Sequence, residues 1–196
     1  MLHLDQIRRT LSAYRPVSRA ADDGDTLAAV AIILTGNVED PSLLFIERAE
    51  RSGDPWSGQM AFPGGRHDPG DSSLCMTAVR ETREEVGLDI SSSEVLGRLD
   101  EQGGRRVGAP SGIRVAPFVF FEDSPGALVL NHEVQSAMWV PLSRLLDPAR
   151  RVEYHHRGIG GPFEGVLVGE PDRHVVWGLT RRMLRSFVEL FGLSLP

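Results

Sequence analysis

The sequence contains no lysine, a single cysteine and no long apolar run. Cys75 has no partner for an internal disulfide, which favours a reducing compartment and gives little reason to expect a cysteine nucleophile. No apolar stretch approaches the roughly 20 residues that a membrane-spanning helix needs, and residues 1–15 lack the continuous apolar core of a secretory signal. We therefore expect a cytoplasmic protein without a membrane segment.

Basic charge is also scarce, because 27 acidic residues outnumber 21 basic ones and give a net charge of -6. This balance argues against general binding to nucleic acid, which depends on a cationic surface. An anionic substrate would need a cation to help hold it. All basic residues are arginines, whose guanidinium groups suit bidentate contacts with phosphate.

A chain of 196 residues fits one domain, and we expect a helical N-terminal extension over residues 1–24 followed by a domain over residues 25–196. Apolar patterning predicts irregular alternation of helices with mostly antiparallel strands, which favours an α+β sandwich over a doubly wound parallel sheet. Strands are expected at 27–34, 43–46, 59–62, 95–100, 113–121, 137–140, 165–168 and 174–177, and helices at 1–15, 73–86 and 179–191.

The clearest predicted helix follows Ser72 and Ser73, either of which can cap it, and ends at Gly87. At about 100° per residue, its apolar and small side chains gather on one face that should pack against the core. Three acidic side chains gather on the neighbouring face, which we expect not to pack. They are Glu81, Glu84 and Glu85.

The carboxylates on this face repel one another, because residues three and four apart are neighbours on a helix. Clustered carboxylates are good ligands for Mg²⁺ or Mn²⁺, which bind protein carboxylates together with substrate phosphates. The alternative is a solvated helix face with salt bridges to Arg80 and Arg83. The preceding segment FPGGRHDPGD favours the metal site, because glycines allow close backbone approach to a ligand.

Residues 65–88, GRHDPGDSSLCMTAVRETREEVGL, resemble the Nudix box. Two departures are visible: Asp71 stands where the motif has its first glutamate, with eight rather than seven residues before Arg80, and Thr82 occupies a normally apolar position. The matching positions are Gly65, Arg80, Glu81, Glu84, Glu85, Gly87 and Leu88.

This resemblance implies a hydrolase of nucleoside diphosphates linked to another moiety, folded as an α/β/α sandwich around a mixed sheet. It implies that Glu84 and Glu85 are the principal metal ligands, with the backbone of Gly65 beside them. Glu81 either completes the metal site or acts as the base, and Arg80 orients the carboxylates. Many members are dimers, so the resemblance also allows a homodimer.

Further candidates lie outside the box. Glu133 resembles the additional metal-binding or basic glutamate of some Nudix enzymes, or is a solvated residue at a strand edge. Arg48 and Arg51 flank the loop before FPGG and are candidates for substrate contacts, with Gly64 and Gly65 offering their backbone. Trp56 either stacks on a base or closes the loop onto the core.

The segment LLFIERAERSGDPWSGQMAFPGG resembles, in degraded form, the signature of the coenzyme A pyrophosphatase branch. The resemblance implies cleavage of coenzyme A or an acyl-CoA into 4'-phosphopantetheine and 3',5'-ADP. Substrate choice depends on loops, so ADP-ribose, nucleotide sugars, dinucleoside polyphosphates and nucleoside triphosphates remain alternatives. A non-catalytic nucleotide sensor is a different class of function, which loss of the metal glutamates would indicate.

Overall fold

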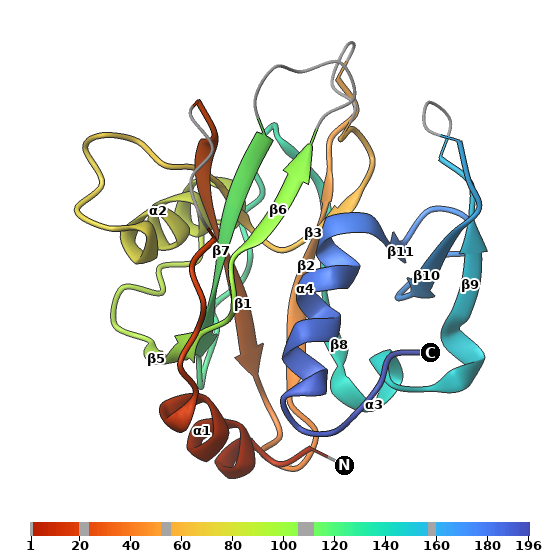
Figure 1. The fold of residues 1–196 in the computed structure, drawn as a ribbon, viewed down its shortest axis with the longest axis horizontal. Coiled ribbons are helices and arrows are strands. Elements are labelled where there is room, and N and C mark those ends of the chain that lie inside the picture. The colour runs from red at the N-terminus through yellow and green to blue at the C-terminus, as the bar shows by residue number, and fades with distance from the viewer. Residues whose placement is uncertain (1, 20–23, 52–55, 106–111, 157–159) are drawn as a thin grey trace.

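The computed structural model describes residues 2–19, 24–51, 56–105, 112–156 and 160–196, and Figure 1 shows their arrangement. The helices are α1 (Leu4–Ala13), α2 (Leu74–Val86), α3 (Leu142–Leu145) and α4 (Gly178–Glu189), with a 3-10 turn at Pro148–Arg150. The strands are β1 (Thr26–Thr35), β2 (Ser42–Arg48), β3 (Met60–Ala61), β4 (Gly64–Arg66), β5 (Glu94–Arg98), β6 (Gln102–Arg105), β7 (Gly112–Phe121), β8 (Val134–Pro141), β9 (Arg151–Tyr154), β10 (Phe163–Leu167) and β11 (Val175–Val176).

The centre of the main sheet is β1, which pairs in parallel with β7 from Thr26 opposite Ile113 to Leu34 opposite Phe121. The other edge of β1 is shared by two strands. Near its end β1 pairs antiparallel with β2, and near its start it pairs antiparallel with β4. The sheet is completed by β3 and β8 on β2, and by β5 and β6 on β7, so it is mixed as expected.

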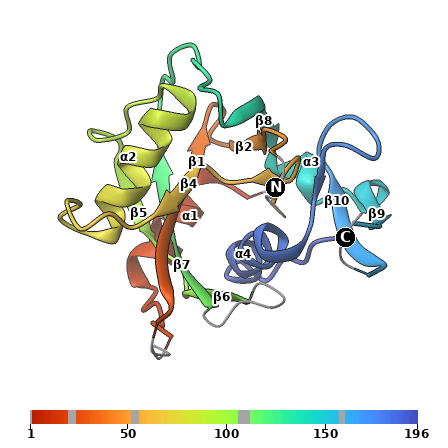
Figure 2. The ribbon, with the colours of Figure 1, turned by 90° about the horizontal axis from the view of Figure 1, so that it is seen from above.

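Alternate side chains of β1 enter two different cores, because successive residues of a strand point to opposite faces. Ile32 and Leu34 lie in the core that includes α4, whereas Ala31 and Ile33 lie in the core that includes α2. Seen from above, the sheet therefore runs between α2 and α4 (Figure 2). This is the α/β/α sandwich that the resemblance to the Nudix box implies, and it agrees with the α+β class that the strand and helix pattern predicts.

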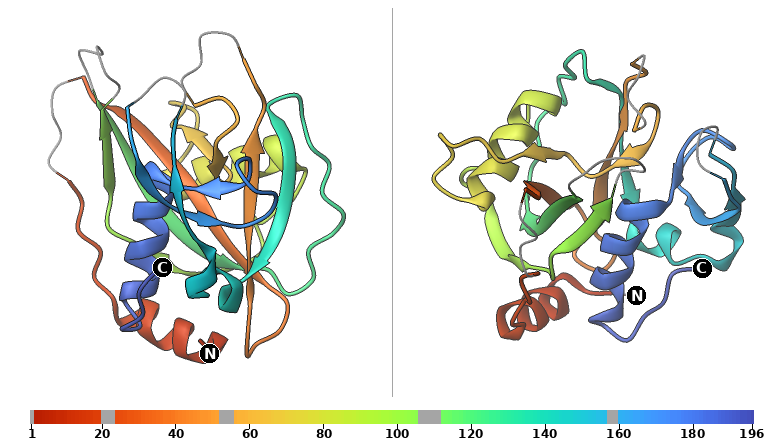
Figure 3. Two further views of the ribbon diagram at one scale, coloured as in Figure 1. Left: turned by 90° about the vertical axis from the view of Figure 1, so that its right-hand side faces the viewer. Right: turned by 45° about the horizontal axis from the view of Figure 1, so that its top comes forward.

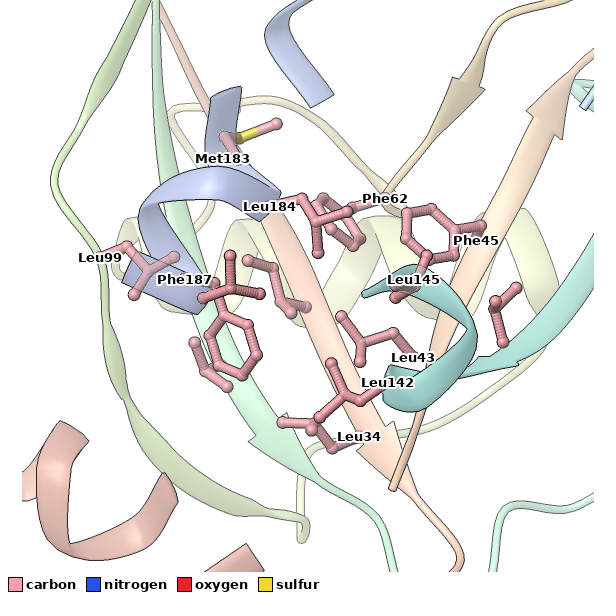
Figure 4. Close-up of a cluster of buried hydrophobic side chains, with 14 of the residues drawn as sticks. Leu34, Leu43, Phe45, Phe62, Leu99, Leu142, Leu145, Met183, Leu184 and Phe187 are labelled. Atoms are coloured by element: carbon pink, nitrogen blue, oxygen red, sulfur yellow. The ribbon is translucent and has the colours of Figure 1, made fainter. Parts of the chain in front are cut away.

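The larger core contains long aliphatic and aromatic side chains from α3, α4 and the sheet (Figure 4). Phe45 and Phe62 stack within it with ring centroids 4.9 Å apart. The smaller core is lined on β1 by Ala29 and Ala31, both fully buried. Small residues at these positions let α2 approach the sheet closely, which matters for the acidic side chains that α2 carries.

A second sheet, ordered β11-β10-β9, stands beside α4 at the side of the main sheet formed by β2 and β8 (Figures 1 and 3). All of its pairs are antiparallel. It follows β8 in the chain and leads directly into α4, so it connects the end of the main sheet to the helix that covers one face.

The expected strands and helices are all present among the described residues, with end points shifted by a few residues. The hairpin of β1 and β2 is confirmed, although only two residue pairs join these strands, because the start of β1 pairs with β4 along the same edge. Three strands were not predicted, β4, β6 and β9. Two of them read Gly-Gly-Arg and Gln-Gly-Gly-Arg and carry no apolar pattern that could signal a strand.

The N-terminal helix α1 is an integral part of the larger core. Leu4, Ile7 and Leu11 are buried on one of its faces, and the Leu4 N–H donates to the Val38 carbonyl at 2.8 Å. Among the described residues, no helix has the length and apolarity that crossing a membrane would require.

Burial of α1 predicts that Ile7→Ala destabilises the whole protein. Ile7 is fully buried, so the substitution removes apolar contacts and leaves a cavity, which should lower the free energy of unfolding by about 2–5 kcal/mol. Arg9→Ala on the exposed face of the same helix is the control and should change stability by less than about 0.5 kcal/mol. Urea denaturation measures both, and equal effects would show that α1 is not held by its apolar face.

Candidate active site

Helix α2 begins and ends as its sequence predicts. The Ser73 hydroxyl accepts a hydrogen bond from the Met76 N–H at 3.2 Å, which caps the first turn. Gly87 adopts the left-handed conformation with φ 69°, and its N–H donates to the Arg83 carbonyl at 3.0 Å. The fixed ends set the rotation of the helix and thereby the direction in which its glutamates point.

The two glycines before α2 allow the backbone of β4 to touch the helix. Gly64 has φ +151°, and a Cβ there would lie 2.3 Å from the Ala29 carbonyl oxygen. A Cβ on Gly65 would lie 2.5 Å from the carboxyl carbon of Glu81. No larger residue fits either position without moving the backbone or the glutamate. Gly64 therefore approaches β1 closely and Gly65 approaches Glu81 of α2, whereas the predicted approach of this backbone to a ligand stays a prediction.

Glu85 is buried, with 2% of its surface exposed, so the prediction that all three glutamates lie on an unpacked face is wrong for this residue. Its Oε2 accepts a hydrogen bond from the Gly64 N–H at 2.9 Å. Burial raises the pKa of Glu85 to about 7; the Gly64 N–H and Arg48 oppose this rise, whereas Glu81 and Glu133 add to it. The cause of the error is β4, which covers a helix face that periodicity alone leaves open.

Arg80 organises the carboxylates around it. Its Nε and Nη2 donate to the two oxygens of Asp71 at 2.9 and 3.0 Å, and its Nη1 donates to Glu81 and Glu84 at 2.9 and 3.1 Å. The hydrogen bonds from Arg80 lower the pKa of Asp71, against the effect of burial, and the same pair raises the pKa of Arg80. Thr77 also donates to Asp71 at 2.8 Å.

Asp71 is thus fully engaged as a hydrogen-bond acceptor, which makes it a partner of Arg80 rather than an open ligand. Sequence reasoning did not identify Thr77, although its place one helical turn before Arg80 puts both on the same side of α2. His67 also lies in this group, with Nδ1 2.8 Å from the Thr77 hydroxyl. The segment before α2 is therefore fastened to the helix by polar side chains.

Glu81 and Glu84 differ in environment although they share Arg80. The Glu84 side chain is 54% exposed, whereas Glu81 is half-buried beneath Gly65. Burial raises the pKa of Glu81, and the neighbouring charges of Glu84 and Glu133 add to this rise while Arg80 opposes it. An open cleft of about 640 Å³ borders this group and is lined by Asp71, Arg80, Arg83 and Glu84, among others.

Glu133 lies immediately before β8 and joins the same electrostatic group. It acts on the pKa of both Glu81 and Glu85, and its Oε1 lies 2.9 Å from Arg51 Nη1. Arg48, at the end of β2, acts on the pKa of Glu85. The structure therefore brings together the residues that the sequence analysis proposed from three separate segments.

Trp56 is half-buried in the turn between β2 and β3, where its carbonyl accepts from the Gln59 N–H at 3.3 Å. Neighbouring residues 52–55 of the proposed substrate loop lie outside the described residues. Its two proposed roles, stacking on a base and closing the loop, both remain predictions.

The donor chemistry of this site fits a hard divalent cation, because Glu81, Glu84, Glu85 and Glu133 supply only oxygen and carry more negative charge than Arg80 can neutralise. Glu81 and Glu84 already converge on one cationic group, Arg80 Nη1. In the part of the chain that the structure describes, no three Asp, Glu, His or Cys side chains stand in a metal-holding arrangement as they are placed. The residues fit the ion by the chemistry of their donor atoms, and their carboxylates would have to move together to hold it.

Comparison with known proteins agrees with this geometry. The NUDIX domain family model matches residues 25–159. The uncharacterized Nudix hydrolase NudL of Yersinia pestis (strain Pestoides F) is 32% identical over 153 residues, covering 76% of this chain and 72% of that protein. The chain therefore belongs to the Nudix hydrolase family.

Solved structures support the fold. A MutT/nudix family protein from Enterococcus faecalis has a TM-score of 0.57 at 18% identity, covering 89% of this chain and 65% of its own. A NUDIX hydrolase from Alicyclobacillus acidocaldarius has a TM-score of 0.53 at 20% identity, covering 64% of this chain and 83% of its own. At these identities the likeness concerns the fold alone.

The raised pKa of Glu85 predicts a pH dependence of stability in metal-free buffer. Its carboxyl ionises near its ordinary value of 4.5 in the unfolded chain but near 7 in the native state, so the native state binds more protons between these values. The contribution of Glu85 to stability should fall as the pH rises through this window and stay low above it. Glu85→Gln should remove this loss and raise the free energy of unfolding at pH 8 by up to about 3 kcal/mol.

Chemical denaturation of wild type and variant at pH 4.5 to 8 measures the difference. Glu84→Gln is the matched control, because the exposed Glu84 carboxylate is open to solvent and should leave the slope nearly unchanged. If the wild-type and Glu85→Gln curves run parallel across the window, Glu85 ionises normally in the native state.

Proposed function

We propose that this Nudix hydrolase cleaves a diphosphate linkage in a nucleotide derivative by attack of water, with the help of Mg²⁺ or Mn²⁺. The observation that supports this most directly is the placement of Glu85 and Glu81 against the backbone of Gly64 and Gly65, with the charge of Glu133 close enough to act on both carboxylates. Three carboxylates in one partly desolvated group are unfavourable without a cation, and a diphosphate supplies further negative charge that needs one.

In this proposal, Glu81, Glu84 and Glu85 would hold the metal, beside the backbone of Gly65. The ion supplies charge neutralisation at the diphosphate and lowers the pKa of a water molecule. Arg80 fixes the orientation of Glu81 and Glu84 through hydrogen bonds, and Asp71 fixes Arg80 in turn.

The residue that takes the proton from water is either Glu81 or Glu133. Glu81 is half-buried and its pKa is raised, which strengthens it as a base. Glu133 is held by Arg51 at the rim of the same group, where a bound substrate could displace that ion pair. Both residues act within the same cluster, and single substitutions of each would separate their roles.

For the substrate, we propose coenzyme A or an acyl-CoA, cleaved to 4'-phosphopantetheine and 3',5'-ADP. The proposal is supported by the resemblance of residues 43–65 to the coenzyme A branch and by the position of Arg48 and Arg51 beside the glutamates. Trp56 would stack on the adenine base at the same rim. ADP-ribose, nucleotide sugars, dinucleoside polyphosphates and nucleoside triphosphates are the alternatives that the same chemistry would serve.

The metal proposal predicts that Glu84→Gln or Glu85→Gln lowers kcat by about a hundredfold or more at saturating Mg²⁺, because each removes a charged ligand while preserving side-chain shape. Glu153→Gln, an exposed glutamate on β9 in the second sheet, should leave kcat unchanged. Activity should vanish with a chelator and return with Mg²⁺ or Mn²⁺. Full activity of both ligand variants in metal-containing buffer would overturn the metal assignment.

The substrate proposal predicts that coenzyme A disappears and 4'-phosphopantetheine and 3',5'-ADP form in equal amounts. Because water attacks phosphorus without a covalent enzyme intermediate, hydrolysis in ¹⁸O-water should place one label in the phosphate of one product. Mass spectrometry of the products measures this. If coenzyme A survives while one of the alternative nucleotides is consumed, the substrate is wrong although the diphosphate chemistry holds.

A further inference from the structure

A buried carboxylate, Glu47, lies near the end of β2, one residue before Arg48, and is paired with the exposed Arg173. Glu47 is 5% exposed, and its two oxygens accept from Arg173 Nε at 2.7 Å and Nη2 at 2.9 Å. The Ser136 hydroxyl of β8 donates to the same carboxylate at 2.7 Å. Burial raises the pKa of Glu47, but the hydrogen bonds from Arg173 and Ser136 outweigh it and lower the pKa overall. Glu47 is therefore a charged, doubly anchored carboxylate inside the protein.

The arginine comes from the turn between β10 and β11, beyond the range 25–159 that the family model matches. This turn has a defined shape of its own. The Glu170 N–H donates to His174 Nδ1 at 2.9 Å, and a Cβ on Gly169 would lie 2.3 Å from that same nitrogen. Asp172 adopts a positive φ of 62°, which is uncommon for a residue other than glycine.

His174 lies beside the same carboxylate without a hydrogen bond from its Nε2. Because Nδ1 accepts a hydrogen bond, the neutral imidazole carries its proton on Nε2. Nε2 lies 3.5 Å from Glu47 Oε2. The turn thus presents two successive side chains, Arg173 and His174, to one buried carboxylate of the catalytic sheet.

Glu47 stands where the pairing of β2 with β8 changes register. Glu47 pairs with Ser136 and Arg48 pairs with Val134, so Gln135 is the extra residue of a bulge. A bulge redirects the side chains that follow it. Glu133 lies immediately before Val134, the first residue of β8, and its carbonyl accepts from the Ala49 N–H at 2.8 Å.

We propose that Arg173 is a positioning residue: it holds Glu47, which accepts from Ser136 of β8 beside this bulge, and thereby aims Glu133 at the glutamates of α2. The inference rests on the proposed function, in which Glu133 assists hydrolysis. The turn between β10 and β11, which lies outside residues 25–159, would then determine the position of the Glu133 side chain in the site.

The test is Arg173→Gln assayed for kcat and KM at saturating Mg²⁺, well below the unfolding temperature. Because a misplaced catalytic group weakens the transition state, kcat should fall by about tenfold or more while KM changes by less than about threefold. Glu170→Gln is the matched control, since it removes only the exposed partner that lies 3.3 Å from the same arginine. It should leave both constants unchanged.

A double substitution separates positioning from simple support of the fold. In the Glu133→Gln background, Arg173→Gln should reduce kcat by less than about twofold, because Arg173 acts through the side chain already removed. A purely structural role would instead multiply the two losses. Thermal unfolding of each variant confirms that the assays compare folded protein.

Removing Arg173 leaves a buried carboxylate without its main partner, which can unfold the protein. Arg173→Lys keeps the charge but cannot form the bidentate pair. It should therefore fold and show a loss of kcat between those of wild type and Arg173→Gln. Undiminished kcat in folded Arg173→Gln, or multiplying losses in the double variant, would overturn the inference. Wild-type hydrolysis that depends on Glu84 tests the proposed function separately, so the two failures are distinguishable.

Discussion

The contact between the backbone of β4 and the carboxylates of α2 is the constraint on which the rest of the site depends. The N–H of Gly64 binds Glu85, and Gly65 leaves no room for a side chain above Glu81. This closeness requires β4 to pair with β1 and requires α2 to rest on the small side chains of Ala29 and Ala31. The positions of β1, β4 and α2 therefore depend on one another, and together they determine where the glutamate side chains lie.

The arrangement places like charges together in a partly desolvated place, which opposes folding. Arg80 offsets some of the repulsion, and Asp71 keeps Arg80 in place with a bidentate pair. Glu85 has no comparable cation in direct contact among the described residues, and burial, with a smaller contribution from Glu81, raises its pKa to about 7. Carboxyl groups with a strongly shifted pKa cluster at functional sites, because selection for activity retains them although they lower stability.

Sequence reasoning recovered the features that depend on local patterns. The caps at Ser73 and Gly87 and the apolar strands all have signals within a few residues. It failed for β4, whose Gly-Gly-Arg has no apolar period, and consequently for the burial of Glu85. The pair of Glu47 and Arg173 spans 126 residues, and no local pattern connects two such distant charges. What was missed depends on tertiary contacts rather than on any single segment.

The family model ends at residue 159, yet the sheet that carries the site is not covered without the segments on either side of the matched range. Met183, Leu184 and Phe187 of α4 and Ile7 of α1 lie in one core with Ile32 of β1. Because β1 supports α2 on its opposite face, loosening either terminal helix would relax the strand beneath the glutamates. The positions of the glutamates therefore depend on the packing of α1 and α4 against β1. Substitutions in these two helices can alter the site by shifting β1.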